Sequence, residues 1–228
     1  MNGAEQVFSF RSMLAVCAHP DDESFGLGAV LSTCVGRGVD TRVLCLTHGE
    51  ASTLGTQADL SSIRAKELSA AAAVLGVLSV RLMSYPDGEL SGAPLEELCR
   101  EVEKSVAEHP TDCLVVFDEG GITGHPDHQR ATEAAVVSAD RLGLPVLAWA
   151  LSSAIAADLN DVFGANFVGR EPSEIDVELT VDRALQRQAI SCHVSQSSNN
   201  PVLRRRLALQ GATESLRWLR APDHSGPT

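Results

Sequence analysis

Short apolar runs alternate with longer helical patterns along the first 150 residues of the chain. Five stretches are mostly apolar, at 13–18, 41–47, 79–85, 113–118 and 146–151. Between them, apolar residues recur three or four positions apart, as Leu27, Leu31 and Cys34 do. Strands that alternate with helices of this length predict parallel βαβ units with right-handed crossovers. We therefore expect an α/β fold, Rossmann-like, with three α/β/α layers around a mostly parallel sheet.

Beyond the fifth run the pattern changes. Apolar and polar residues alternate over 177–181, which indicates an antiparallel strand. Helical patterns follow at about 182–192 and 201–219. We expect this additional C-terminal strand and helix region to belong to a single domain over residues 1–220. The remaining residues, 221–228, are predicted to form a disordered tail.

The charge balance argues against a nucleic-acid partner. Eighteen Lys and Arg residues face 30 Asp and Glu residues, which leaves a net charge of −12. Such a surface repels a phosphate backbone. One basic cluster, Arg204, Arg205 and Arg206, lies near the C-terminus, and we interpret it as a solvated face of a helix.

The cysteines and the N-terminal segment point to the cytoplasm. The chain has six cysteines, none in a CxxC pair, and most lie inside apolar runs, where a thiol behaves as a small hydrophobe. Residues 1–13 lack the basic stretch and apolar core of a signal peptide. No apolar run reaches the roughly 18 residues of a membrane span. We therefore expect a cytoplasmic protein without a membrane partner.

Polar, titratable residues follow the first and the fourth apolar runs. The stretch AHPDDES (18–24) follows the first, and DEGGITGHPDHQ (118–129) follows the fourth. In an open parallel sheet, ligands bind outside the carboxyl ends of the strands. Two such loops can therefore meet in space although they are far apart in the sequence.

The spacing within both stretches is typical of a catalytic zinc site. His19 and Asp22 lie three residues apart, and so do His125 and His128. A catalytic zinc takes three protein ligands and leaves one position for water. Four candidate ligands, with a further aspartate in each loop, exceed this need, and the surplus could supply a base and a charge stabiliser. Helix capping would explain one such loop, but two loops with His-Pro-Asp at strand ends favour a metal site.

The two motifs resemble the signatures of the LmbE-like (PIG-L) family of zinc-dependent N-deacetylases. Four further stretches resemble later family blocks in the same order: THGEAS (47–52), IRAKELSAAAAVLGV (63–77), DGEL (87–90) and CHVSQSSNN (192–200). The resemblance spans roughly residues 13–200. It implies a hydrolase that removes an N-acyl group, usually N-acetyl, from an amino-sugar or related small-molecule conjugate.

The resemblance also implies a role for the main site residues. One zinc ion per chain, or another divalent metal, would be held by His19, Asp22 and His128. Asp21 would be the general base that takes a proton from water. His125 would stabilise the tetrahedral oxyanion as imidazolium.

Further residues are assigned by the same resemblance. Asp127 would hold the His125 ring in the right tautomer. Arg64 and Asp87 match family positions that contact a polar, often sugar-like substrate, and His193 matches a histidine near the pocket mouth. Glu23 is either a helix cap or an outer support of the site.

Several alternatives stay open. Thr123 stands where several sugar deacetylases of the family have a tyrosine, so the oxyanion donor can differ. The substrate can instead be a thiol-conjugate or antibiotic-type amide, and the resemblance allows a homo-oligomer. An idle zinc-binding relative is a further reading. A nucleotide-binding loop at Gly26 and Gly28 lacks the third glycine, since that position is Leu31. A serine hydrolase built on Ser24 lacks the glycine-flanked elbow.

Overall fold

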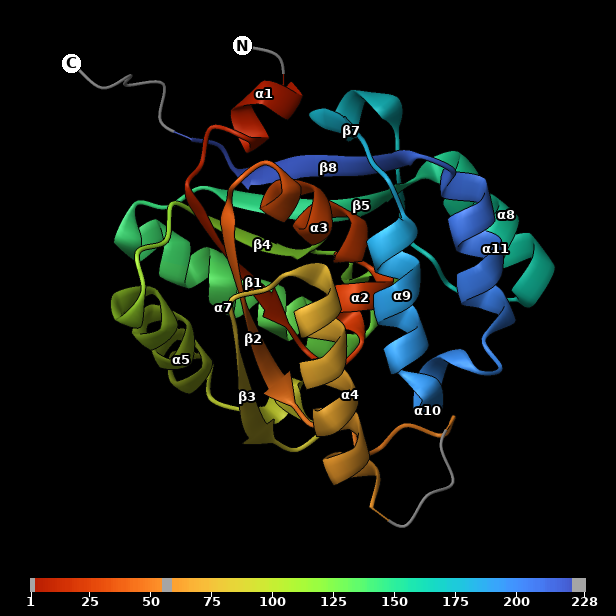
Figure 1. Cartoon of the computed structure of the whole chain (residues 1–228), viewed down its shortest axis with the longest axis horizontal. Coiled ribbons are helices and arrows are strands. Elements are labelled where there is room, and N and C mark those ends of the chain that lie inside the picture. The colour runs from red at the N-terminus through yellow and green to blue at the C-terminus, as the bar shows by residue number, and fades with distance from the viewer. Residues whose placement is uncertain (1–2, 55–58, 223–228) are drawn as a thin grey trace.

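The computed structural model describes residues 3–54 and 59–222. The strands within these ranges form one sheet. The strand order is β3-β2-β1-β4-β5-β8-β7 (Figure 1). The short strand β6 pairs with β5. The strands are β1 (Ser12–Cys17), β2 (Asp40–Thr47), β3 (Ser79–Tyr85), β4 (Cys113–Phe117), β5 (Val146–Ser152), β6 (Gly169–Arg170), β7 (Val177–Thr180) and β8 (Thr213–Arg220).

Helices fill the connections between the strands. They are α1 (Gly3–Val7), α2 (Asp22–Phe25), α3 (Gly28–Gly36), α4 (Leu60–Leu75), α5 (Leu95–Glu108), α6 (Gly121–Gly124), α7 (Pro126–Leu142), α8 (Ser153–Phe163), α9 (Ala184–Cys192), α10 (Val194–Ser197) and α11 (Pro201–Gln210). Two 3₁₀ turns, η1 (Leu90–Gly92) and η2 (Pro172–Glu174), complete the described elements. The α/β class and all five predicted parallel strands are confirmed.

The five predicted strands pair in parallel, in the order β3-β2-β1-β4-β5. Strands β2 and β3 extend the sheet on one side of β1, and β4 and β5 extend it on the other side. The point where the order reverses lies between β1 and β4. In a doubly wound sheet this is where the loops leave a crevice at the carboxyl edge.

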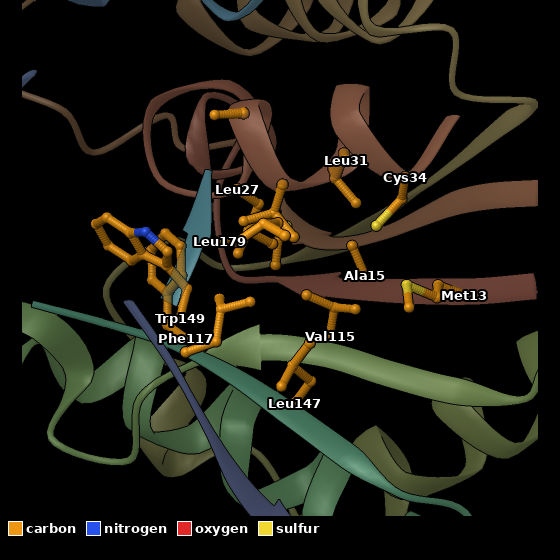
Figure 2. Packing of buried hydrophobic residues seen from close by; sticks show 14 of the residues in the cluster. Met13, Ala15, Leu27, Leu31, Cys34, Val115, Phe117, Leu147, Trp149 and Leu179 are labelled. Atoms are coloured by element: carbon orange, nitrogen blue, oxygen red, sulfur yellow. The ribbon is translucent and has the colours of Figure 1, made fainter. Parts of the chain in front are cut away.

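Alternate residues of each strand point to opposite faces of the sheet, and each face buries its own core. On one face, Ala15 of β1 packs with Leu27 and Leu31 beside the aromatic pair Phe117 and Trp149 (Figure 2). The other face is covered by α5 and α7, which pack against each other (Figure 1). This is the expected three-layer arrangement.

The C-terminal region corrects one prediction. The helix predicted over 201–219 ends at Gln210, and Gly211 follows with a φ of 54°. Residues Thr213–Arg220 form β8, which pairs antiparallel with both β5 and β7. Glu214 and Leu216 are fully buried, two residues apart, so the packing follows the period of a strand. The predicted antiparallel strand near 177–181 is confirmed as β7.

The strands of the sheet come from residues 12 to 220 of the chain, and one domain over 1–220 stays a prediction. Most of the predicted tail, at 223–228, lies outside the described residues. Within the described ranges, no helix is both long and apolar enough to cross a membrane. The cytoplasmic location remains a prediction from the sequence.

Candidate metal centre and active site

The two His-Pro-Asp loops meet at the point where the strand order reverses. The first loop follows β1 and leads into α2, and the second precedes α7, whose first residue is Pro126. Since β1 and β4 are neighbours in the sheet, the loops that follow them share one edge. Two histidines and one aspartate thereby converge from segments about a hundred residues apart, and they form a candidate metal site: His19, Asp22 and His128.

The spacing of their ligand atoms fits zinc. His19 Nδ1 lies 3.2 Å from His128 Nε2, which lies 3.1 Å from Asp22 Oδ1. All three ligand atoms lie within 4.8 Å of one another. Ligand atoms placed tetrahedrally around zinc at its usual bond lengths are about 3.3 Å apart. Two imidazole nitrogens and one carboxylate oxygen are also the donor types that catalytic zinc takes.

Backbone N–H groups and the two neighbouring histidines orient Asp22 as a metal ligand and keep it ionised. Its Oδ2 accepts hydrogen bonds from the backbone N–H groups of Ala18 (3.0 Å) and His19 (2.9 Å), which leaves Oδ1 turned toward His128. Burial raises the pKa of Asp22, but His128 and His19 outweigh burial and hold it below its usual range. The carboxylate is therefore anionic, as a metal ligand must be.

Hydrogen bonds select the ligating nitrogen of each histidine. His19 Nε2 lies 3.0 Å from Asp87 Oδ1 and 3.2 Å from Asp127 Oδ2, so it serves as the donor and leaves Nδ1 free. Burial lowers the pKa of His19, but the bonds to Asp127 and Asp87 raise it overall to about 10, so a metal ion must displace a proton from Nδ1 when it binds. His128 Nδ1 lies 3.1 Å from the carbonyl oxygen of Gly121, which leaves Nε2 free. Such outer partners orient the ligands of metal sites.

The contacts of Asp127 differ from the expected ones. Its carboxylate is fully buried and accepts backbone N–H bonds from Gly88 (2.7 Å) and Leu90 (3.1 Å) in addition to contacting His19. It does not hold the His125 ring. The backbone N–H of Asp127 instead donates to His125 Nδ1 at 3.2 Å, so neutral His125 carries its proton on Nε2.

Asp21 lies in the pocket beside the three ligands. Its backbone has a φ of 114°, a strained value for a residue with a side chain, and its N–H donates to Glu23 Oε2 at 2.9 Å. Its Oδ2 accepts a bond from Arg64 at 3.0 Å. Burial raises the pKa of Asp21 to about 6, with Asp22 adding to the rise and Arg64 opposing it. A carboxyl group with such a pKa suits proton transfer near neutral pH.

Arg64 and Asp87 were predicted to contact the substrate, but both side chains are already bonded to other residues of this chain. Arg64 is 3% exposed and donates to Asp21 and to the backbone carbonyls of Pro20 and Gly49. Asp87 contacts His19 with one oxygen and accepts the N–H of Ala51 with the other (2.8 Å). Both line the pocket, but their hydrogen bonds hold the base and a ligand in place.

His193 is not at the pocket mouth, and that expectation is wrong. Its side chain is fully buried, and its Nε2 lies 2.7 Å from Glu23 Oε1. The other oxygen of Glu23 holds the N–H of Asp21. The turn after α9 directs the ring inward against Phe25, so His193 lies behind the base rather than beside a substrate.

A cavity of about 750 Å³ opens in front of the candidate metal site. This size is in the range of small-molecule sites. One wall is aromatic: Phe117 contacts the His128 ring at 4.8 Å between centroids and Trp149 at 5.2 Å. Thr123, exposed, lies on the lining at the position of the family tyrosine.

The interpretation of the basic cluster is wrong for one of its residues. Arg204 and Arg205 are exposed, and Arg205 pairs with Asp158 at 2.7 Å. Arg206 is 5% exposed and lines the cavity. It lies three residues after buried Leu203 on the inner side of α11. That spacing was a signal for burial, although an arginine is an unusual residue to place there.

Comparisons with known proteins agree with this geometry. Residues 14–139 match the family model PIG-L, GlcNAc-PI de-N-acetylase. The chain is 30% identical over 223 residues to the probable N-acetyl-alpha-D-glucosaminyl L-malate deacetylase 2 of Bacillus anthracis, covering 92% of each chain. It is 34% identical over 177 residues to the 1D-myo-inositol 2-acetamido-2-deoxy-alpha-D-glucopyranoside deacetylase of Mycolicibacterium vanbaalenii, covering 64% of this chain and 62% of that one.

A solved structure supports the fold. The zinc inhibited form of teicoplanin deacetylase Orf2 superposes with a TM-score of 0.69 over 93% of this chain and 99% of that chain, at 20% sequence identity. At this identity the likeness shows the arrangement of helices and strands.

Proposed function

The chain belongs to the PIG-L family, and from this membership we propose that it is a zinc-dependent N-deacetylase of N-acetylated amino-sugar conjugates. Its curated relatives are N-acetyl deacetylases named for glucosaminyl conjugates. The observation that carries the proposal is the convergence of His19, Asp22 and His128, with the carboxylate of Asp21 beside them in an open cavity.

The proposed ligands are His19, Asp22 and His128. Zinc held there supplies a Lewis acid that polarises the amide carbonyl and acidifies water to near neutral pH. Asp21 accepts the proton that water loses as its oxygen attacks the carbonyl carbon. When the carbon–nitrogen bond breaks, the same carboxyl group returns that proton to the leaving amine. A pKa of about 6 suits both transfers.

His125 is the proposed donor to the developing oxyanion. Burial, together with His128 and His19 nearby, lowers the pKa of His125. The side chain therefore acts as a neutral imidazole that donates from Nε2, in place of the imidazolium expected from the family resemblance. A fixed donor directed at charge that exists only in the transition state contributes to rate rather than to binding.

The substrate proposed is an N-acetylglucosaminyl conjugate. The relative from Bacillus anthracis is named for a glucosaminyl malate, and the cavity of about 750 Å³ has room for a sugar ring with an attached group. An amide of a thiol conjugate or an antibiotic is the second candidate.

Metal analysis combined with product identification tests this function. We expect about one zinc per chain and release of acetate from N-acetylglucosaminyl conjugates, lost with a chelator and restored by zinc. Arg205→Gln, on the exposed side of α11, is the matched control and should behave like the wild type. Zinc-loaded protein that releases no acetate from any such conjugate would contradict the proposal. Release of a larger acid from a thiol conjugate or an antibiotic would favour the second candidate.

A further inference from the structure

Arg206 places a buried positive charge in the cavity wall without a carboxylate of its own. Within the described ranges, its hydrogen bonds go to two neutral acceptors, the carbonyl oxygen of Phe25 (2.6 Å) and Gln210 Oε1 (3.2 Å). Its guanidinium lies over the ring of Trp149, 4.9 Å from the centroid. A buried arginine is normally paired with an anion, because an uncompensated charge is costly to remove from water.

The nearest acidic group is already engaged by another arginine. Glu214, fully buried, pairs through Oε1 with Arg183. Its Oε2 accepts bonds from Trp149 Nε1 (2.7 Å) and Gln210 Nε2 (2.8 Å). The cluster of Arg183, Arg206 and Glu214 thus contains two cations and one anion. Burial, only partly offset by Glu214, lowers the pKa of Arg206 to about 10, which still leaves it charged at neutral pH.

This charge lies away from the candidate metal site, along the aromatic wall. Three successive contacts connect them: His128 to Phe117 at 4.8 Å, Phe117 to Trp149 at 5.2 Å and Trp149 to Arg206 at 4.9 Å. The acidic residues of the lining surround the metal site. The lining contributed by the start of α11 and the turn before it is neutral apart from Arg206: Asn199, Asn200, Pro201 and Val202.

We propose that Arg206 binds an anionic group, a carboxylate or a phosphate, on the part of the substrate that is attached to the amino sugar. This inference rests on the proposed deacetylase function and specifies its substrate class. With the acetamide at the metal site, the sugar ring lies along Phe117 and Trp149, and the attached group reaches the guanidinium. The planar fork of arginine is suited to either oxyanion.

A comparison of three substrates tests the proposal: N-acetylglucosaminyl malate, N-acetylglucosamine 1-phosphate and the neutral methyl N-acetylglucosaminide. We expect the wild type to prefer an anionic substrate in kcat/KM. Arg206→Gln, which keeps donors for Phe25, should reduce the anionic-to-neutral ratio by about 10- to 100-fold, the range for a hydrogen bond to a charged group. Arg206→Lys should retain part of the ratio, and the control Arg205→Gln all of it.

The outcomes separate the two sources of charge. A preference for the malate conjugate alone identifies a carboxylate, and a preference for the 1-phosphate alone identifies a phosphate. Equal preference shows that charge is sufficient. An unchanged ratio in Arg206→Gln, or a wild type without preference for either anion, would overturn the proposal.

Direct binding distinguishes failure of this inference from failure of the proposed function. In Asp21→Asn protein, calorimetry should show glucosaminyl malate or glucosamine 1-phosphate binding at least about 10-fold more tightly than methyl glucosaminide, and Arg206→Gln should remove the difference. If no substrate is cleaved, the deacetylase function is wrong, and these affinities still decide the role of Arg206. Equal affinities for charged and neutral ligands would refute it even in an active enzyme.

Discussion

The two loops that form the site contain the same tripeptide, His-Pro-Asp, and use it in opposite ways. In the first loop the histidine, His19, is a candidate ligand, and the aspartate, Asp21, lies in the pocket. In the second loop the histidine, His125, lines the pocket, and the aspartate, Asp127, is fully buried behind the metal site. Only the fourth residue has the same proposed task in both.

The backbone conformation after the proline explains why the histidine and the aspartate have opposite roles in the two loops. In the first loop Asp21 takes a φ of 114° before the short α2 begins, which turns its side chain to the pocket. In the second loop His125 caps α7, and Pro126 starts a helix of 17 residues, so Asp127 lies in its first turn. A shared motif therefore predicts where chemistry occurs, and the local backbone decides which side chain performs it.

The surroundings of Asp21 and Asp127 shift their pKa values in opposite directions. The pKa of Asp21 is raised to about 6, chiefly by burial. The pKa of Asp127 is lowered, because bonds from His19 and from the N–H groups of Gly88 and Leu90 outweigh its burial. One carboxyl group is thus suited to exchange protons and the other to remain charged.

The largest effect should come from the fourth position of the second loop. His128→Ala should lose most of its zinc and at least about 10³-fold in kcat/KM, because the Lewis acid is worth several kcal/mol. Metal content and turnover check this directly. Full zinc occupancy together with normal activity in His128→Ala would show that this residue is not a ligand.

Replacement of the pocket aspartate tests the first loop. Asp21→Asn keeps the shape and removes the basicity, so zinc content should stay near that of the wild type while kcat falls by about 10²–10⁴. Asp22→Asn, its neighbour, should instead weaken zinc binding. Equal zinc loss in the two variants would remove the distinction between base and ligand.

The pocket histidine of the second loop should give the next effect. His125→Ala should keep its zinc, while kcat falls by about 10²–10³, the typical loss for one transition-state donor. Comparison of metal content with His128→Ala is the control. Metal loss in His125→Ala with retention in His128→Ala would reverse their assigned roles.

The smallest effect should come from the buried aspartate. Asp127→Asn should weaken zinc affinity by about 10- to 100-fold, as loss of an outer partner does, and saturating zinc should restore most of the turnover. A metal titration of activity measures both quantities. A fall in kcat that zinc does not restore would place Asp127 in the chemical step, beside Asp21.

The central strands could be predicted from the sequence because each is a short apolar run buried on both faces. The run at 113–118 differs from β4, which is buried throughout, by one residue. The run at 79–85 coincides with β3, which lies at the edge of the sheet and is only partly buried. β8 was missed because TESLRWLR mixes charged and apolar residues. Its burial depends on pairing with β5 and β7 from distant parts of the chain.

The candidate ligands could also be predicted from the sequence, because they depend on short spacings and on the position of strand ends. His19 and Asp22 are close in sequence, and the rule for strand ends brings the second loop to them. Roles that depend on tertiary contacts were not predictable. The burial of His193 requires Glu23, and the burial of Arg206 requires Phe25, each from a distant part of the chain.

The position of β8 between β5 and β7 has a consequence for synthesis on the ribosome. All proposed metal ligands have been translated by residue 128, whereas Glu214, which pairs with Arg183 beneath Trp149, belongs to β8. At roughly 5–20 residues per second, several seconds separate the two. We therefore expect the nascent chain to offer its zinc ligands before it has built the wall that selects a substrate.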